Sequence, residues 1–172
     1  MNQIKSIGLG KLTIHGKAVI AESMYAKGKS FLGAAVLLRQ KRQSEADTYV
    51  FLHLLCQSVE LILKSILLAA DYDGFHPELT KLGHKLLKIA DATIAATAVA
   101  PMRAALAKEL HQLDQTFASH RLRYGSGYDI LVNPDTISYR KVLSRIVAVI
   151  RFIEKKVGVT SAISNKIRES KP

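Results

Sequence analysis

The sequence predicts an all-α protein, organised as an antiparallel four- to five-helix up-and-down bundle. Apolar residues recur every three to four positions in several long segments, and no segment alternates apolar and polar residues for long enough to build a sheet. The segment 45–70 is rich in leucine and isoleucine and contains neither glycine nor proline. A chain of 172 residues is long enough for one domain with its own hydrophobic core.

Five segments carry helical signals. Ser44 is an expected N-cap for the strongest of them, and Pro101 stands where a first-turn proline is tolerated. Gly28 marks a possible break in the first helix. The expected helices span 17–40, 45–70, 81–98, 102–120 and 134–156. We therefore expect an N-terminal arm at 1–16, a helical bundle at 17–157 and a flexible basic tail at 158–172.

Composition excludes several classes of protein. Hydrophobic residues make up 48% of the chain and charged residues 23%, which excludes intrinsic disorder. The single cysteine, Cys56, excludes an intramolecular disulfide and a cysteine-rich zinc module. The first sixteen residues lack the continuous apolar stretch of a secretory signal, and polar residues interrupt the longest apolar helix. We expect a cytoplasmic protein with no membrane partner.

Positive charge accumulates in the C-terminal third. The whole chain has 25 Lys+Arg against 14 Asp+Glu, a formal charge of +11. From Arg121 to the end there are 11 basic and four acidic residues, which accounts for +7. A polyanion partner such as RNA and ordinary surface charge both explain this excess, and only clustering on one face would favour binding.

Polar residues form a narrow ridge on the otherwise apolar helix at 45–70. They recur at positions i, i+4, i+7 and i+11, within a wedge of about 60°, and they are His53, Gln57, Glu60 and Lys64. Glu60 precedes Lys64 by four residues, the favoured order for a helical ion pair. The ridge is either a solvated strip on a mostly buried helix or the lining of a cleft or dimer seam.

Three segments together resemble HEPN domains, a superfamily of nucleotide-binding helical bundles. HLLCQSVELILKSILLA (53–69) is similar to their second helix, GHKLLKI (83–89) to their Gly-His-x-Leu element, and RLRY (121–124) to their Arg-Tyr element. The resemblance implies a helical bundle, often homodimeric, of the kind found in toxin–antitoxin, abortive-infection and RNA-processing systems.

Many members of that superfamily are metal-independent ribonucleases with an Arg-x4–6-His motif, and here the sequence departs from them. The first histidine after Arg103 is His111, which is too far away, and no histidine follows Arg121 or Arg123. The resemblance therefore implies a non-catalytic or degenerate member.

The candidate binding site combines the ridge with His84 and with the arginine-tyrosine corner. Two guanidinium groups and one aromatic ring suit phosphate binding and base stacking, or equally a helix cap. The candidate residues are His53, Gln57, Glu60, Lys64, His84, Arg121, Arg123 and Tyr124.

Three functions stay open from sequence alone. The first is a homodimeric module that binds RNA, a nucleotide or a partner protein. The second is a ribonuclease with a rebuilt site, in which His84 or His120 acts as general base beside Arg121 or Arg123. The third is an accessory subunit of a defence pair. The histidines lack metal-ligand spacing, so we expect neither a metal nor a cofactor.

Overall fold

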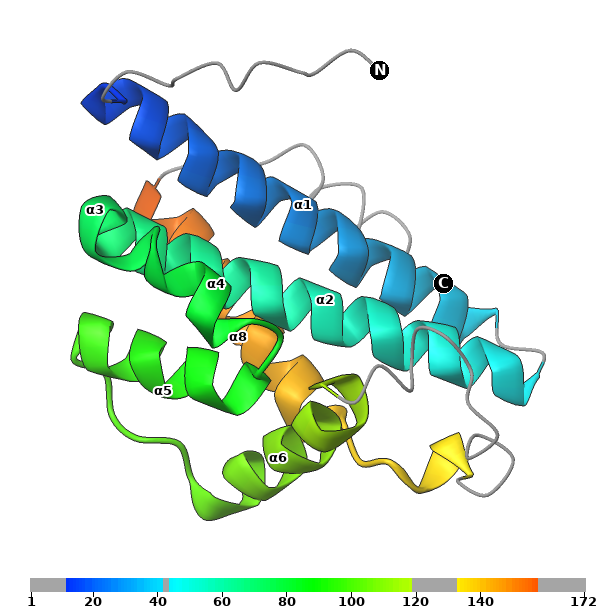
Figure 1. The fold of residues 1–172 in the computed structure, drawn as a ribbon. Coiled ribbons are helices and arrows are strands. Elements are labelled where there is room, and N and C mark those ends of the chain that lie inside the picture. Colours follow the sequence, from blue (N-terminus) through cyan, green and yellow to red (C-terminus); the bar gives the residue numbers. More distant parts are fainter. Residues whose placement is uncertain (1–11, 42–43, 119–132, 158–172) are drawn as a thin grey trace, which may run out of the picture.

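The computed structural model describes residues 12–41, 44–118 and 133–157, and within these ranges the chain is all-helical (Figure 1). The prediction of an all-α fold is confirmed for this part. It contains seven α-helices and one short 3-10 helix, η1. They are α1 (Ile14–Gln40), α2 (Glu45–Ala70), α3 (Tyr72–Phe75), α4 (Glu78–Leu82), α5 (Leu86–Thr97), α6 (Ala104–Ala118), η1 (Pro134–Thr136) and α8 (Arg140–Val157).

Helices α1 and α2 form a long antiparallel pair (Figure 1). Ser44 begins α2 with a capping box, in which its side chain accepts from the Asp47 backbone N–H and the Asp47 side chain accepts in return. Helix α1 begins at Ile14, inside the expected arm, and runs through Gly28 without a break. A Cβ at Gly28 would stand 2.7 Å from Cγ1 of Ile62, so this glycine lets the two helix backbones approach closely.

The expected third helix is divided in two. Gly83 lies between α4 and α5 with a φ of 54°, a left-handed conformation that favours glycine and ends α4. The short α3 and α4 carry the chain back along the molecule, so α5 runs in the same direction as α2 in Figure 1.

The core surrounds α2. Its residues Leu52, Leu55 and Ile62 are fully buried, and side chains of α1, α5, α6 and α8 complete the cluster. The segment Asp47–Ala70 is the one helix of the described chain that is long and apolar enough to cross a membrane by length and composition alone. Here its apolar side chains are packed by neighbouring helices, and central core helices share that composition.

The last two long helices, α6 and α8, pack against each other and both contribute side chains to the core. Helix α6 buries Leu110, Leu113 and Phe117 in the core. The expected fifth helix begins as η1, with Asn133 as its cap, and α8 starts only at Arg140. Figure 1 places α8 behind α2, and its buried residues Ile146 and Ile150 belong to the same core cluster.

Candidate functional site

The polar ridge of α2 is turned toward the protein interior. Glu60 and Lys64 are 5% and 8% exposed, whereas His53 and Gln57 are half-buried. Two charged groups at this depth need partners because an unpaired buried charge costs several kcal/mol. The burial of Glu60 and Lys64 therefore favours an enclosed ridge over a solvated strip.

Glu60 joins two cationic or polar neighbours. Its Oε1 lies 2.8 Å from Nζ of Lys64, one helical turn further along α2. Its Oε2 lies 2.9 Å from Nδ1 of His84, in the segment between α4 and α5. Nζ of Lys64 also donates to the carbonyl oxygen of Gly83 at 2.7 Å. We call Glu60, Lys64, His84 and the Gly83 carbonyl the Glu60 network.

The conformation of Gly83 positions this network. Its positive φ turns the chain sharply after α4, so that the Gly83 carbonyl and the next side chain, His84, both meet α2. The network thereby fixes the start of α5 against the centre of the fold. A single glycine thus supports contacts between residues 19 and 24 positions apart in sequence.

The arrangement also orients the His84 ring. With Nδ1 directed to the Glu60 carboxylate, a neutral imidazole that donates from Nδ1 keeps Nε2 as an acceptor. The His84 side chain is 42% exposed, so solvent reaches the residue. A carboxylate that fixes the orientation of a partly exposed imidazole is a common basis for general acid–base chemistry.

Helix α6 closes the network from the other side. The ring centroid of Phe117 lies 5.8 Å from that of His84, in an edge-to-face arrangement, and 5.8 Å from that of His53. One aromatic ring thus links two of the sequence-predicted histidines.

The structure brings only part of the predicted site together. Glu60, Lys64 and His84 are in direct contact, and His53 joins them through Phe117. Gln57 lies half-buried on the same side of α2. The arginine-tyrosine corner and the alternative base fall outside the described residues, and they are Arg121, Arg123, Tyr124 and His120.

Sequence reasoning missed Glu109, a buried carboxylate on α6. It accepts from Oγ of Ser138 at 2.9 Å and from the backbone N–H of Val142 at 2.8 Å. These contacts satisfy a free N–H in the first turn of α8 and place negative charge at the positive end of that helix. The signal in the sequence that could have identified Glu109 is its position directly beside the apolar residues of α6.

Two cavities lie away from the Glu60 network. One, of about 400 Å³, lies where α1 ends and α2 and α8 begin. At its edge the Arg39 guanidinium stacks 4.7 Å from the ring centroid of Tyr139 and 5.5 Å from that of Phe51. Its lining combines two arginines with two aspartates, and consists of Arg39, Asp47, Thr48, Phe51, Asp135, Tyr139 and Arg140.

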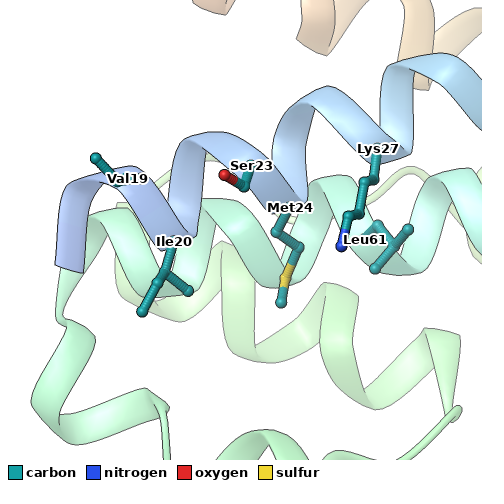
Figure 2. Close-up of a pocket in the computed structure, with 6 residues that line it drawn as sticks. All are labelled: Val19, Ile20, Ser23, Met24, Lys27 and Leu61. Atoms are coloured by element: carbon teal, nitrogen blue, oxygen red, sulfur yellow. The ribbon is translucent and has the colours of Figure 1, made fainter. Parts of the chain in front are cut away.

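The second cavity, of about 320 Å³, is a mainly apolar groove between α1 and α2. Figure 2 shows Ile20, Met24 and Lys27 projecting from α1 on the side of Leu61. Val19 on the same helix is 42% exposed. We call this the α1–α2 groove.

The solvent side of α8 carries a dense basic surface. Its basic residues are all exposed, and they are Arg140, Lys141, Arg145, Arg151, Lys155 and Lys156. Phe152 lies among them with 63% of its surface exposed. The one acid of α8, Glu154, is half-buried and forms an ion pair with Lys29 of α1. We call these six residues and Phe152 the basic face of α8.

Two other candidate chemistries find little support in the described residues. Burial raises the pKa of the Cys56 thiol, with further contributions from Asp114 and Glu60, so the reactive thiolate is disfavoured. Within the described ranges, no group of three or more histidine, cysteine, aspartate or glutamate side chains is arranged to hold a metal ion.

Comparison with known proteins adds no identification. No family model matches the chain, and neither the search of curated proteins nor the search of solved structures found a match.

Proposed function

We propose that this protein is a non-catalytic, HEPN-like helical module that binds RNA through the basic face of α8. The observation that carries the proposal is the clustering of exposed cations on one helix. Lys141, Arg145 and Lys155 fall within a sector of about 80° at 100° per residue, and all three are exposed. One-sided clustering of this kind is the electrostatic signature of a phosphate-binding surface.

Helix stability alone does not account for the positions of the basic residues along α8. Lys155 and Lys156 are favourable in the last turn, but Arg140 and Lys141 stand in the first turn, where the helix dipole disfavours cations. Buried Glu109 compensates that end of the helix. An external polyanion would give exposed Lys141 a favourable partner at this end of the helix.

Salt-dependent RNA binding tests the proposal. Anisotropy with labelled single-stranded RNA should give a slope near −3 for log K against log salt, as expected for about four phosphate contacts. The double variant Arg145→Ala/Lys155→Ala should weaken binding about tenfold and reduce the slope by about 1.4. Lys88→Ala/Lys108→Ala removes the same charge from exposed positions on α5 and α6 and should change neither quantity. Equal loss in both double variants would refute a specific basic face.

The remaining expectations extend this proposal. A homodimer in a bacterial defence or toxin–antitoxin pair follows from the HEPN resemblance, with the arginine-tyrosine corner as a further nucleotide contact, and the cytoplasmic location stays a prediction. The antiparallel four- to five-helix order also stays a prediction, with the change that α5 follows α4 and runs in the same direction as α2.

The α1–α2 groove is the dimer surface that we favour because it exposes apolar side chains. Met24→Glu should then lower the mass measured by light scattering, whereas Ala26→Glu on exposed α1 surface should not.

A second candidate function is favoured by the contact between Glu60 and His84. An imidazole fixed by a carboxylate could remove a proton from a ribose 2′-hydroxyl, as a metal-independent ribonuclease requires. Incubation of structured RNA with the parent protein and with His84→Ala, in the presence of a chelator, tests this. Cleavage by the parent and not by the variant would support it, and an intact substrate in both would refute it.

The third function that the sequence left open, an accessory subunit that binds only protein, would give neither cleavage nor retention on heparin.

A further inference from the structure

The basic face of α8 contains one exposed aromatic ring. Phe152 is 63% exposed and stands in the stripe formed by Lys141, Arg145 and Lys155. Single exposed apolar residues are common and by themselves need no explanation. This one differs because every charged residue that borders it on the solvent side of α8 is basic.

The ring also lies close to a cation. Nζ of Lys156 is 5.9 Å from the centroid of Phe152, within the range of a cation–π contact. Arg151 directly precedes Phe152, Lys155 follows it by three residues, and both are exposed. A planar ring next to phosphate-binding side chains is the combination with which proteins hold nucleic acid whose bases are unstacked.

A lipid surface fits this helix less well. Basic amphipathic helices bind membranes by inserting their apolar face. In α8 that face is occupied, since Val142, Ile146 and Ile150 are buried in the core cluster. Only Phe152 is left to enter a bilayer, whereas stacking on a base requires just one ring.

We propose that Phe152 is a base-stacking platform that makes the basic face selective for single-stranded polynucleotides over duplexes. This inference rests on the proposed function and adds to it the class of ligand. In a duplex the bases are paired and stacked on one another, so their flat faces cannot reach Phe152, and only the phosphates remain for the cations. In a single strand, one base can leave the stack and pack on the ring while neighbouring phosphates meet Arg145 and Lys155.

Selectivity is measured with a single-stranded RNA of about 16 nucleotides, the same strand as DNA, and the RNA paired with its complement. The parent protein should prefer the single strands to the duplex. Phe152→Ala should weaken single-strand binding about 5- to 150-fold, the range expected for loss of one stacked base. Its salt slope, duplex affinity and retention on heparin should stay at the parent values because no charge has changed.

A fluorescent variant reports the stacking itself. The chain contains no tryptophan, so Phe152→Trp introduces a single reporter. A base stacked on that indole should quench its emission on addition of single strand and should not do so on addition of duplex. Val99→Trp, at an exposed position outside α8, is the matched control and should give no quenching with either ligand.

The outcomes separate this inference from the function on which it rests. Equal affinity for single strand and duplex, with Phe152→Ala at the parent value, would overturn the stacking platform and leave electrostatic RNA binding intact. Absence of binding to every polynucleotide, or binding only to anionic phosphatidylserine vesicles, would overturn both. A preference for single-stranded DNA over single-stranded RNA would overturn RNA as the ligand in the proposed function and leave the stacking platform intact.

Discussion

Replacement of Glu60 by glutamine tests how the buried ridge of α2 is held. The parent carboxylate accepts from Lys64 at 2.8 Å and contacts Nδ1 of His84 at 2.9 Å. Glutamine preserves the shape of the side chain but removes the negative charge. Lys64 then keeps its positive charge at 8% exposure, with the Gly83 carbonyl as its other partner.

The magnitude follows from the burial of the pair. Removal of one partner from a buried ion pair costs about 3–5 kcal/mol because the other charge is left uncompensated. The amide oxygen and the Gly83 carbonyl offset part of this cost, so we expect Glu60→Gln to lower the free energy of unfolding by about 3 kcal/mol. For a chain of this size, that corresponds to a fall of roughly 6–12 °C in Tm.

Urea denaturation followed by circular dichroism measures the change. The matched control is Glu78→Gln, which breaks the exposed Glu78–Lys81 pair, whose side chains are 46% and 74% exposed. That variant should lose less than about 0.5 kcal/mol. Glu60→Gln/Lys64→Met should be more stable than Glu60→Gln because it removes the buried charge. If Glu60→Gln costs no more than Glu78→Gln, the pair is not buried as described and the reasoning fails.

Three further predictions concern packing, capping and pH. Gly28→Ala should destabilise the protein by about 1–3 kcal/mol because its Cβ would meet Ile62. Gly33→Ala should stabilise it by about 0.5–1 kcal/mol because a Cβ at that position has no neighbouring atom within 4 Å. Urea denaturation measures both changes. Glu109→Ala should lower the free energy of unfolding by about 1–3 kcal/mol, and full stability in that variant would contradict its role as the cap of α8. Burial and nearby Glu154 raise the pKa of Tyr25 to about 12, so the folded state retains a proton that the unfolded state releases above about pH 10. The Tyr25 contribution to stability should therefore be lost as the pH rises from about 10 to 12, and the difference in Tm between the parent and Tyr25→Phe should change over that interval and not below it.

The helices were predictable where local signals decide them. The segment 45–70 begins at a capping serine and ends at an aspartate-rich turn, and α2 has these same limits, Glu45–Ala70. The expected helix 81–98 was wrong as a single element, because its apolar spacing continues across Gly83 while the backbone does not. Periodicity reports which side chains share a face, but it does not register a single residue with a positive φ.

The candidate site was predictable only in part. The Glu60–Lys64 pair follows from a spacing of four residues on one helix, so the sequence contains the necessary information. The candidate site included His84, but its contact with Glu60 depends on how a loop returns to α2, which spacing along one helix does not determine. The basic face of α8 was visible as an excess of charge, but its one-sided exposure depends on which face of α8 the core buries.

The amino-acid order alone determined the all-helical character, the limits of α2 and the pairing of charges one turn apart, because backbone geometry fixes those relations within a few residues. Only the tertiary structure decided that Glu60 and Lys64 are buried, that Glu109 caps α8 and that Phe152 faces solvent. Each of these depends on contacts between segments 20 or more residues apart, and such contacts are set by the packing of whole helices.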